Sequence, residues 1–293
     1  RDTPESAWRT YAEWDTEEMM GTRVLAFSAD NRRMYLLSSA GTDKIQLRVA
    51  DPASKQEKVL AEDGDVDVGD VLFSPAKHIP QAVLFIKERY EWNVLDPALA
   101  DHFAALRALR RGNFWIASRD AADKTWIVGY DSDDGPYHYY TYDLTRWKGE
   151  LLFTARDALQ GFVLARMEPI AFTSRDGLAL HGYLTTPLGV PASRLPTVLL
   201  VHGGPSQRDE WGFNPVVQWL ANRGYAVLQV NFRGSTGYGK KFAAGAIREW
   251  GGKMNDDLVD AVRWAVAQGI TDAQRIAIFG GSYGGYAALV GLA

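Results

Sequence analysis

The sequence predicts two domains of different class: part of a β-propeller over residues 1–166, and an α/β domain with a doubly wound, mainly parallel sheet over residues 167–293. Three observations lead to this prediction. Strand-like runs repeat through the first part at a nearly constant interval. Strand-like and helix-like segments alternate through the second part. A G-x-S-x-G pentapeptide, Gly280 to Gly284, joins an apolar run to a helix-like run near the end.

The repeats in the first part begin at residues 34, 82 and 125, that is, 48 and 43 residues apart. Met34–Ser39, Ala82–Lys87 and Thr125–Tyr130 occupy equivalent places, which we interpret as the first strand of each unit. This interval is typical of four-stranded propeller blades and predicts about three of them. Three blades cannot close a ring, so we expect further blades before Arg1. Ala98–Arg111 has helical spacing and is interpreted as an insertion on one blade.

Two acidic clusters in this part could in principle hold a metal ion. Neither places the glycine and the glutamate in the register of a calcium-binding helix–loop–helix, so we interpret both as solvated turns. They are Asp63, Asp65 and Asp67, and Asp131, Asp133 and Asp134. We therefore expect no metal and no cofactor.

The second part opens with a predicted hairpin, Ile170–Ser174 with Leu178–Thr185, joined by a turn that contains glycine. Thr197–Val201 is a continuous apolar run of the kind found in parallel strands covered on both faces. Asn214 and Pro215 predict the start of a helix that runs to Arg223. Tyr225–Val230 is then the next strand.

The remaining segments complete the alternation of helices and strands. Asn255 is predicted to cap a helix with Asp256 and Asp257 in its first turn, where carboxylates suit the helix dipole. Ile276–Phe279 is the strand before the pentapeptide, and Tyr286–Leu292 is predicted to be a buried helix after it.

Composition narrows the possible functions. The chain has 293 residues, of which 46% are hydrophobic and 23% charged, as in ordinary folded proteins. A net charge of -4 gives no reason to expect nucleic acid or an anionic membrane as a partner. The absence of cysteine excludes disulfides and thiol catalysis. No apolar run approaches the roughly 20 residues of a membrane span, and no signal peptide is visible, so the compartment, cytoplasmic or periplasmic, stays open.

The pentapeptide fits a nucleophile elbow, in which Ser282 stands on a sharp turn between a strand and a helix. Such a turn needs small neighbours, and its strained backbone is tolerated where a hydroxyl must project into a cleft. Gly285 is predicted to let the following helix pass close to the sheet. By itself the pentapeptide is also compatible with a glycine-rich turn that carries an incidental serine. A dinucleotide site is disfavoured, because the G-x-G-x-x-G order is missing.

His202-Gly203-Gly204-Pro205 follows the Thr197–Val201 strand directly. In an open α/β sheet the carboxyl ends of the strands border the ligand site. Glycines at that place let backbone N–H groups face an oxyanion, and the amide of Tyr283 would supply a second donor. Alone, the two glycines could also form a plain turn.

Four motifs in order, HGGP, NFRGSTGYG, EWGGKMNDDLVDAV and GGSYGGYA, resemble the prolyl oligopeptidase family of serine peptidases, nearest to its acylaminoacyl-peptidase and dipeptidyl-peptidase-like branch. The resemblance implies a β-propeller over an α/β-hydrolase domain, with a short peptide as substrate in the cavity between them. It implies that Ser282 is the nucleophile and that the amides of Tyr283 and Gly204 bind the oxyanion. His202 stands where dipeptidyl peptidases carry a tyrosine, which favours the acylaminoacyl-peptidase branch and leaves a contact of this side chain with substrate as one possible role.

The triad of α/β-hydrolases runs in the order Ser, Asp, His. We therefore expect the Asp and His after Ala293, and expect the chain to be a fragment that lacks both ends and is nearly inactive by itself. Two alternatives remain for the parent protein: an esterase or lipase on the same core, and a propeller-type interaction protein without catalysis. Side-chain preference, endo- or exopeptidase action and homo-oligomer formation stay open.

Overall fold

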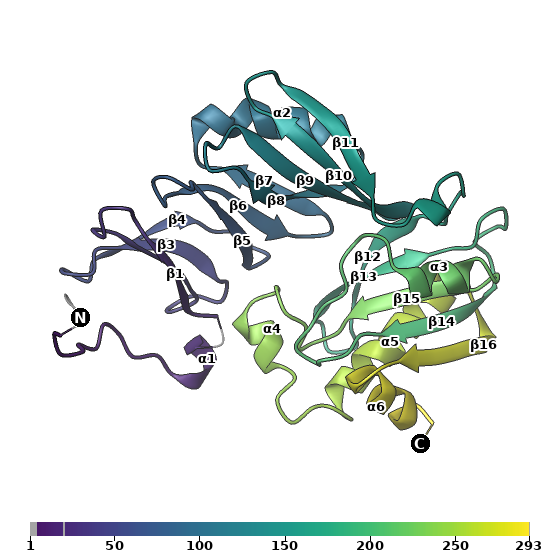
Figure 1. Ribbon diagram of the computed structural model, residues 1–293. Coiled ribbons are helices and arrows are strands. Elements are labelled where there is room, and N and C mark those ends of the chain that lie inside the picture. Colours follow the sequence, from purple (N-terminus) through teal and green to yellow (C-terminus); the bar gives the residue numbers. More distant parts are fainter. Residues whose placement is uncertain (1–4, 20, 293) are drawn as a thin grey trace.

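The computed structural model describes residues 5–19 and 21–292, so both outer limits of the two expected domains lie outside the described residues. The first part forms three antiparallel sheets, which Figure 1 shows following one another along an arc. Their strands are, in sheet order, β1 (Arg23–Phe27), β2 (Met34–Ser38), β3 (Gln46–Ala50) and β4 (Glu57–Ala61); β5 (Val68–Phe73), β6 (Pro80–Ile86) and β7 (Tyr90–Val94); and β11 (Lys148–Thr154), β10 (Gly135–Asp143), β9 (Thr125–Ser132) and β8 (Asn113–Arg119).

The repeat found in the sequence is confirmed, but the place of its strands is corrected. The runs that begin at residues 34, 82 and 125 lie in β2, β6 and β9, and each of these is, in chain order, the second strand of its sheet. The first strands, β1, β5 and β8, are more exposed and less uniformly apolar, so a pattern of apolar residues detects the second strands first.

The middle sheet has three strands rather than four. The helix predicted over Ala98–Arg111 is present as η1 (Pro97–Leu99) and α2 (Ala100–Leu109), and it follows β7 directly. Phe103 and Leu106 of α2 are fully buried in one cluster with Trp126 and Tyr130 of β9. The helix therefore joins the middle sheet to the third sheet instead of forming an addition on a complete blade. Two further short helices are α1 (Thr16–Met19) and η2 (Asp157–Leu159).

The second part is a five-stranded sheet in the order β12 (Met167–Thr173), β13 (Ala179–Thr185), β15 (Ala226–Asn231), β14 (Leu195–Val201) and β16 (Thr271–Gly280). β12 and β13 form an antiparallel hairpin, and β13 pairs antiparallel with β15, whereas β15, β14 and β16 are parallel. The helices are α3 (Pro215–Ala221), α4 (Lys240–Ala244), α5 (Lys253–Ala267) and α6 (Tyr283–Val290). The predicted hairpin, parallel strands and alternation with helices are all present.

Helices cover both faces of this sheet, as the apolar strands require. On one face, Val217 and Leu220 of α3 pack on Val198 and Val227. On the other face, α5 and α6 pack on the alternate residues of β14 and β15, among them Leu199. Because β15, β14 and β16 run in the same direction, their carboxyl ends lie at one edge of the sheet. Figure 1 shows this domain beneath the propeller part.

Three local predictions for the helices are wrong. α5 begins at Lys253 after Gly252, so Asn255 lies within the helix and does not cap it. The close approach to the sheet falls on Gly284 rather than on Gly285, whose β-carbon would make only ordinary contacts. α6 is not buried along its whole length, because Leu289 is 69% exposed.

The acidic clusters are not simple solvated turns, because both contain residues that join the two parts of the molecule. Asp67 accepts hydrogen bonds from the backbone N–H groups of Ile45 (2.7 Å) and Gly239 (3.2 Å). Asp133 is buried and accepts one from the N–H of Met167 (2.9 Å). Within the described residues, no three His, Asp or Glu side chains lie close enough together to hold a metal ion.

Candidate active site

Ser282 lies on the turn between β16 and α6 with φ 54° and ψ -120°, a conformation that non-glycine residues rarely adopt. The turn is tight against the end of β14. A β-carbon on Gly284 would lie 2.1 Å from the Val201 carbonyl oxygen, and one on Gly280 would lie 2.6 Å from the same atom. Only glycine fits at both positions, which is the physical reason for the G-x-S-x-G spacing.

The HGGP loop borders this serine. A β-carbon on Gly203 would lie 3.4 Å from Ser282 Cβ and 3.9 Å from Ser282 Oγ. Gly204 has φ +120°, and a β-carbon there would lie 2.6 Å from the Ser206 nitrogen. Glycine is therefore required at position 204, whereas a β-carbon at position 203 would be in ordinary contact with Ser282. The backbone of this loop thus runs directly beside the serine.

Tyr283 is the first residue of α6, where the backbone N–H groups of a helix have no partner within the helix. Its buried ring packs between Phe232 (5.2 Å between ring centroids) and Trp250 (5.4 Å), and its hydroxyl donates to the Trp250 carbonyl oxygen (3.0 Å). These contacts fix the residue that follows the serine.

His202 is held by its own surroundings. Its Nδ1 lies 2.8 Å from the Gly203 carbonyl oxygen and its Nε2 lies 3.0 Å from Ser235 Oγ. The ring is stacked on Phe232 at 4.4 Å and 14°. Burial lowers the pKa of His202, so the ring is neutral near pH 7. A neutral ring with its proton on Nδ1 donates to the Gly203 carbonyl oxygen and leaves Nε2 as an acceptor. The single proton of the Ser235 hydroxyl then has two acceptors within reach, His202 Nε2 at 3.0 Å and the Phe232 carbonyl oxygen at 2.7 Å.

A cavity of about 350 Å³ lies next to the same loop, between the two parts of the molecule. Gln207 and Arg208 of the loop line one side of it, and Ile45, Val68 and Ile86 of the first two sheets line the other. Both guanidinium ends of Arg208 bind the propeller part, through the carbonyl oxygens of Ile86 (3.0 Å) and Lys87 (3.3 Å). The cavity is of a size that accepts a side chain, and charged side chains also line it: Asp67, Arg208, Glu210 and Lys240.

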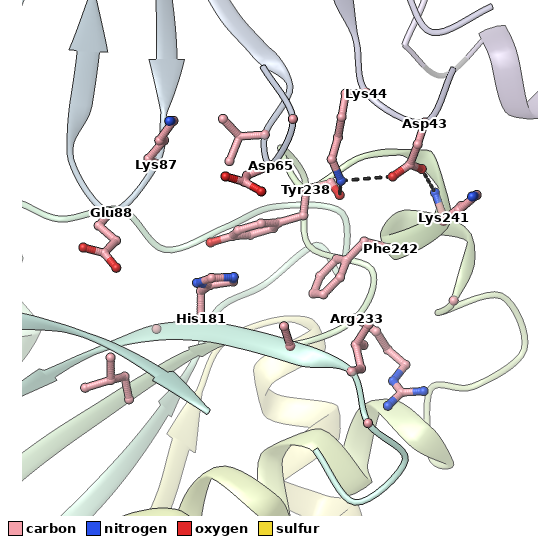
Figure 2. Close-up of a pocket in the computed structure, with 18 of the residues that line it drawn as sticks. Asp43, Lys44, Asp65, Lys87, Glu88, His181, Arg233, Tyr238, Lys241 and Phe242 are labelled. Carbon is pink, nitrogen blue, oxygen red and sulfur yellow. Dashed lines mark hydrogen bonds and ion pairs between the residues drawn. The ribbon is translucent and has the colours of Figure 1, made fainter. Parts of the chain in front are cut away.

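A larger cavity of about 910 Å³ also lies between the two parts of the molecule. Figure 2 shows His181 on its floor, below the ring of Tyr238, with Glu88 and Asp65 on the propeller side. The imidazole and the phenol are stacked at 5.3 Å and 7°. His181 therefore faces this cavity and Tyr238.

The sequence did not single out several residues that shape the site. Phe232 and Ser235 contact His202. Both belong to the NFRGSTGYG motif, which does not predict these contacts. Arg233, between them, is buried against Asp257 of α5. The spacing of a motif reports that such residues are present, but not which partners they have in space.

A strained serine between a parallel strand and a helix, facing a glycine loop at the carboxyl edge of a doubly covered sheet, defines an α/β-hydrolase. The repeated antiparallel sheets beside it are of the propeller type. Comparison with known proteins agrees with both assignments. Residues 211–293 match the prolyl oligopeptidase family. The chain is 43% identical to dipeptidyl aminopeptidase BIII of Pseudoxanthomonas mexicana over 293 residues, 98% of this chain and 42% of that protein.

It is also 34% identical to dipeptidyl peptidase family member 6 of Caenorhabditis elegans over 317 residues, 100% of this chain and 43% of that protein. Among solved structures, a puromycin-hydrolyzing peptidase of Mycobacterium tuberculosis has the same fold, with a TM-score of 0.70 at 23% identity, over 92% of this chain and 42% of that one. By these comparisons, residues 211–293 match the prolyl oligopeptidase family of serine peptidases, and nearly the whole chain is similar to peptidases of that kind. It spans less than half the length of these relatives. Within the described residues, no helix is both long and apolar enough to cross a membrane.

Proposed function

We propose that the protein is a serine peptidase that releases dipeptides from the N-terminus of short peptides through an acyl-enzyme on Ser282. The observation that carries the proposal is the strained turn that holds Ser282 against the Gly203–Gly204 loop. The two relatives that match nearly the whole chain are both named as dipeptidyl peptidases. This supports dipeptide release over the acylaminoacyl-peptidase action that the His202 position favoured.

In the proposed reaction, Ser282 Oγ attacks the scissile carbonyl carbon and its proton passes to a general base, which the family resemblance expects to be a histidine. The carbonyl oxygen gains the negative charge, and the backbone N–H groups of Tyr283 and Gly204 stabilise it. Each such donor contributes about 3 kcal/mol to the transition state. The C–N bond then breaks, the amine leaves with a proton from the base, and water hydrolyses the ester by the reverse sequence.

A fluorophosphonate probe tests the nucleophile in the full-length protein. We expect it to label Ser282 once and to block hydrolysis, and we expect Ser282→Ala to abolish labelling. The Ser206→Ala variant, which changes another serine near the same loop, should be labelled like the wild type. Labelling that survives Ser282→Ala would refute the assignment.

The substrate class is tested with chromogenic dipeptide amides that differ only at the N-terminus. Dipeptide release requires the free amine, so the N-acetylated substrate should be cleaved at least 100-fold less efficiently. Equal cleavage of both, or preference for the acetylated form, would favour acylaminoacyl-peptidase action. Hydrolysis of esters without any hydrolysis of amides would favour the esterase alternative.

A further inference from the structure

Arg233 stands at the turn after β15, and its guanidinium is buried between two carboxylates. Its backbone N–H and its Nε donate to Asp257 Oδ2 (2.9 and 2.8 Å), and its Nη2 donates to Asp257 Oδ1 (2.6 Å). Nη1 and Nη2 each donate to Asp176 at 2.8 Å. These bonds raise the pKa of Arg233 and lower that of Asp176. The turn is thereby tied to α5, which carries the fully buried Asp257.

Phe232 and Ser235, one residue before and two residues after Arg233, contact residues of the candidate active site. Phe232 is fully buried, with His202 stacked on its ring at 4.4 Å and Tyr283 packed against it at 5.2 Å. Ser235 is also fully buried, and its Oγ lies 3.0 Å from His202 Nε2 and 2.7 Å from the Phe232 carbonyl oxygen. One turn therefore contacts the residue two positions before Gly204 and the residue after Ser282.

We infer that the turn Phe232–Ser235, fixed by the Arg233–Asp257 ion pair, positions the two backbone N–H groups that bind the oxyanion, and that His202 serves as its link to the Gly203–Gly204 loop. The inference rests on the proposed function, because it concerns the same oxyanion site. His202 lies between the turn and the loop: its Nε2 faces Ser235 and its Nδ1 faces the Gly203 carbonyl. A hydrogen bond from Nδ1 to that carbonyl fixes the peptide unit whose N–H belongs to Gly204.

This geometry separates positioning from binding of substrate. A donor whose place is wrong by a fraction of an ångström stabilises the transition state less, while it leaves the affinity for the ground state nearly unchanged. Residues that act through one contact also lose their effect together, so a double variant costs no more than the worse single variant. A side chain that binds substrate directly would instead change KM, and its effect would add to that of Ser235.

The first experiment compares Ser235→Ala, His202→Ala and the double variant in the full-length protein, with a dipeptide amide as substrate. We expect kcat to fall about 10-fold in each single variant, a part of the 10²–10³ that one lost oxyanion donor costs. KM should change less than twofold, and the double variant should match His202→Ala. The rate of fluorophosphonate labelling at Ser282, which needs the same oxyanion site, should fall in parallel.

Two conservative variants give a sharper readout. His202→Gln keeps a polar atom near the Nε2 position, facing Ser235, whereas His202→Asn keeps one near the Nδ1 position, facing Gly203. If the link needs both contacts, each restores only part of kcat. Ser235→Ala then lowers kcat further in the Gln variant and has no effect in the Asn variant.

Asp260→Asn is the matched control, because Asp260 lies one turn farther along α5 and holds an ion pair of the same kind. Its partner is Arg175 (2.8 Å), in the turn between β12 and β13. This variant should keep wild-type kcat and KM. Asp257→Asn should lower kcat at least as much as Ser235→Ala, and its melting temperature shows whether it is folded.

The outcomes separate this inference from the proposed function. A wild-type protein that neither reacts with the probe nor cleaves the amide would refute the proposed function. An active wild type in which Ser235→Ala and His202→Ala leave kcat unchanged, or raise KM additively, would refute the positioning role alone.

Discussion

Gly284 has no room for a side chain, because a β-carbon there would lie 2.1 Å from the backbone oxygen of Val201. That oxygen belongs to β14, which is paired with β15 on one side and β16 on the other, and it cannot move aside without disturbing the sheet. We expect Gly284→Ala to lower the free energy of unfolding by about 2–3 kcal/mol, as measured by urea denaturation. Gly64→Ala is the control, since nothing lies within 4 Å of a β-carbon at that exposed position. Equal midpoints for the two variants would contradict the close approach.

Gly204 is restricted for a different reason: its φ of +120° is open to glycine and strained for other residues. A valine would turn the peptide group that carries the proposed oxyanion donor. We expect Gly204→Val to lower kcat by about 10²–10³-fold with a smaller change in KM, because the donor acts where charge develops. Steady-state kinetics on a dipeptide amide measures both constants. A change confined to KM would count against the proposed role of this amide.

At the scale of single elements, α3 begins with a complete cap. Asn214 Oδ1 accepts hydrogen bonds from the N–H groups of Val216 (2.9 Å) and Val217 (3.2 Å). Asn214→Ala should therefore cost about 1 kcal/mol in the free energy of unfolding, measured by denaturant. Asn222→Ala, at the exposed other end of the same helix, should cost less than half of that. If the two variants unfolded at the same midpoint, the cap would contribute nothing.

A structural feature could be predicted from the sequence where residues close to it in the chain determine it. The parallel strands and the Asn214 cap follow from local apolar runs and local hydrogen bonding, and both were predicted. The start of α5 was misplaced, because Asn255 has the composition of a cap while Asp257 is turned inward to Arg233, a partner 24 residues away. A cap and a buried ion pair use the same residue types, so composition could not distinguish them.

The candidate site divides in the same way. Ser282 and Gly204 could be proposed from the sequence because their motifs occur together and resemble those of a known family, and the tight turns around them have local steric reasons. The contact of Ser235 with His202 joins residues 33 positions apart and has no sequence signal. Likewise, an acidic turn exposed to water and an acidic turn packed against another domain have the same composition. The sequence therefore did not predict that Asp133 contacts the second part of the molecule.

At the scale of the whole molecule, Asp131 joins the third sheet to the segment after the HGGP loop. Its Oδ1 accepts a hydrogen bond from the N–H of Phe213 (2.9 Å), and a β-carbon on Gly212 would lie 1.8 Å from its Oδ2. Burial raises the pKa of Asp131 to about 7, with Asp133 and Glu210 acting in the same direction against the Phe213 hydrogen bond.

The raised pKa of Asp131 determines the direction in which stability changes with pH. The folded protein keeps the Asp131 proton up to about pH 7, whereas the unfolded chain releases it near pH 4. The contribution of this group to stability is therefore full below pH 4 and is lost as the pH rises toward 7. Asp131→Asn cannot ionise, so its free energy of unfolding relative to wild type should rise by roughly 1–3 kcal/mol between pH 5 and pH 8. Denaturant unfolding at four pH values measures it, with Asp101→Asn on the exposed face of α2 as the control that should follow the wild type. A difference between Asp131→Asn and wild type that stays constant with pH would show that Asp131 ionises as freely in the folded protein as in the unfolded chain.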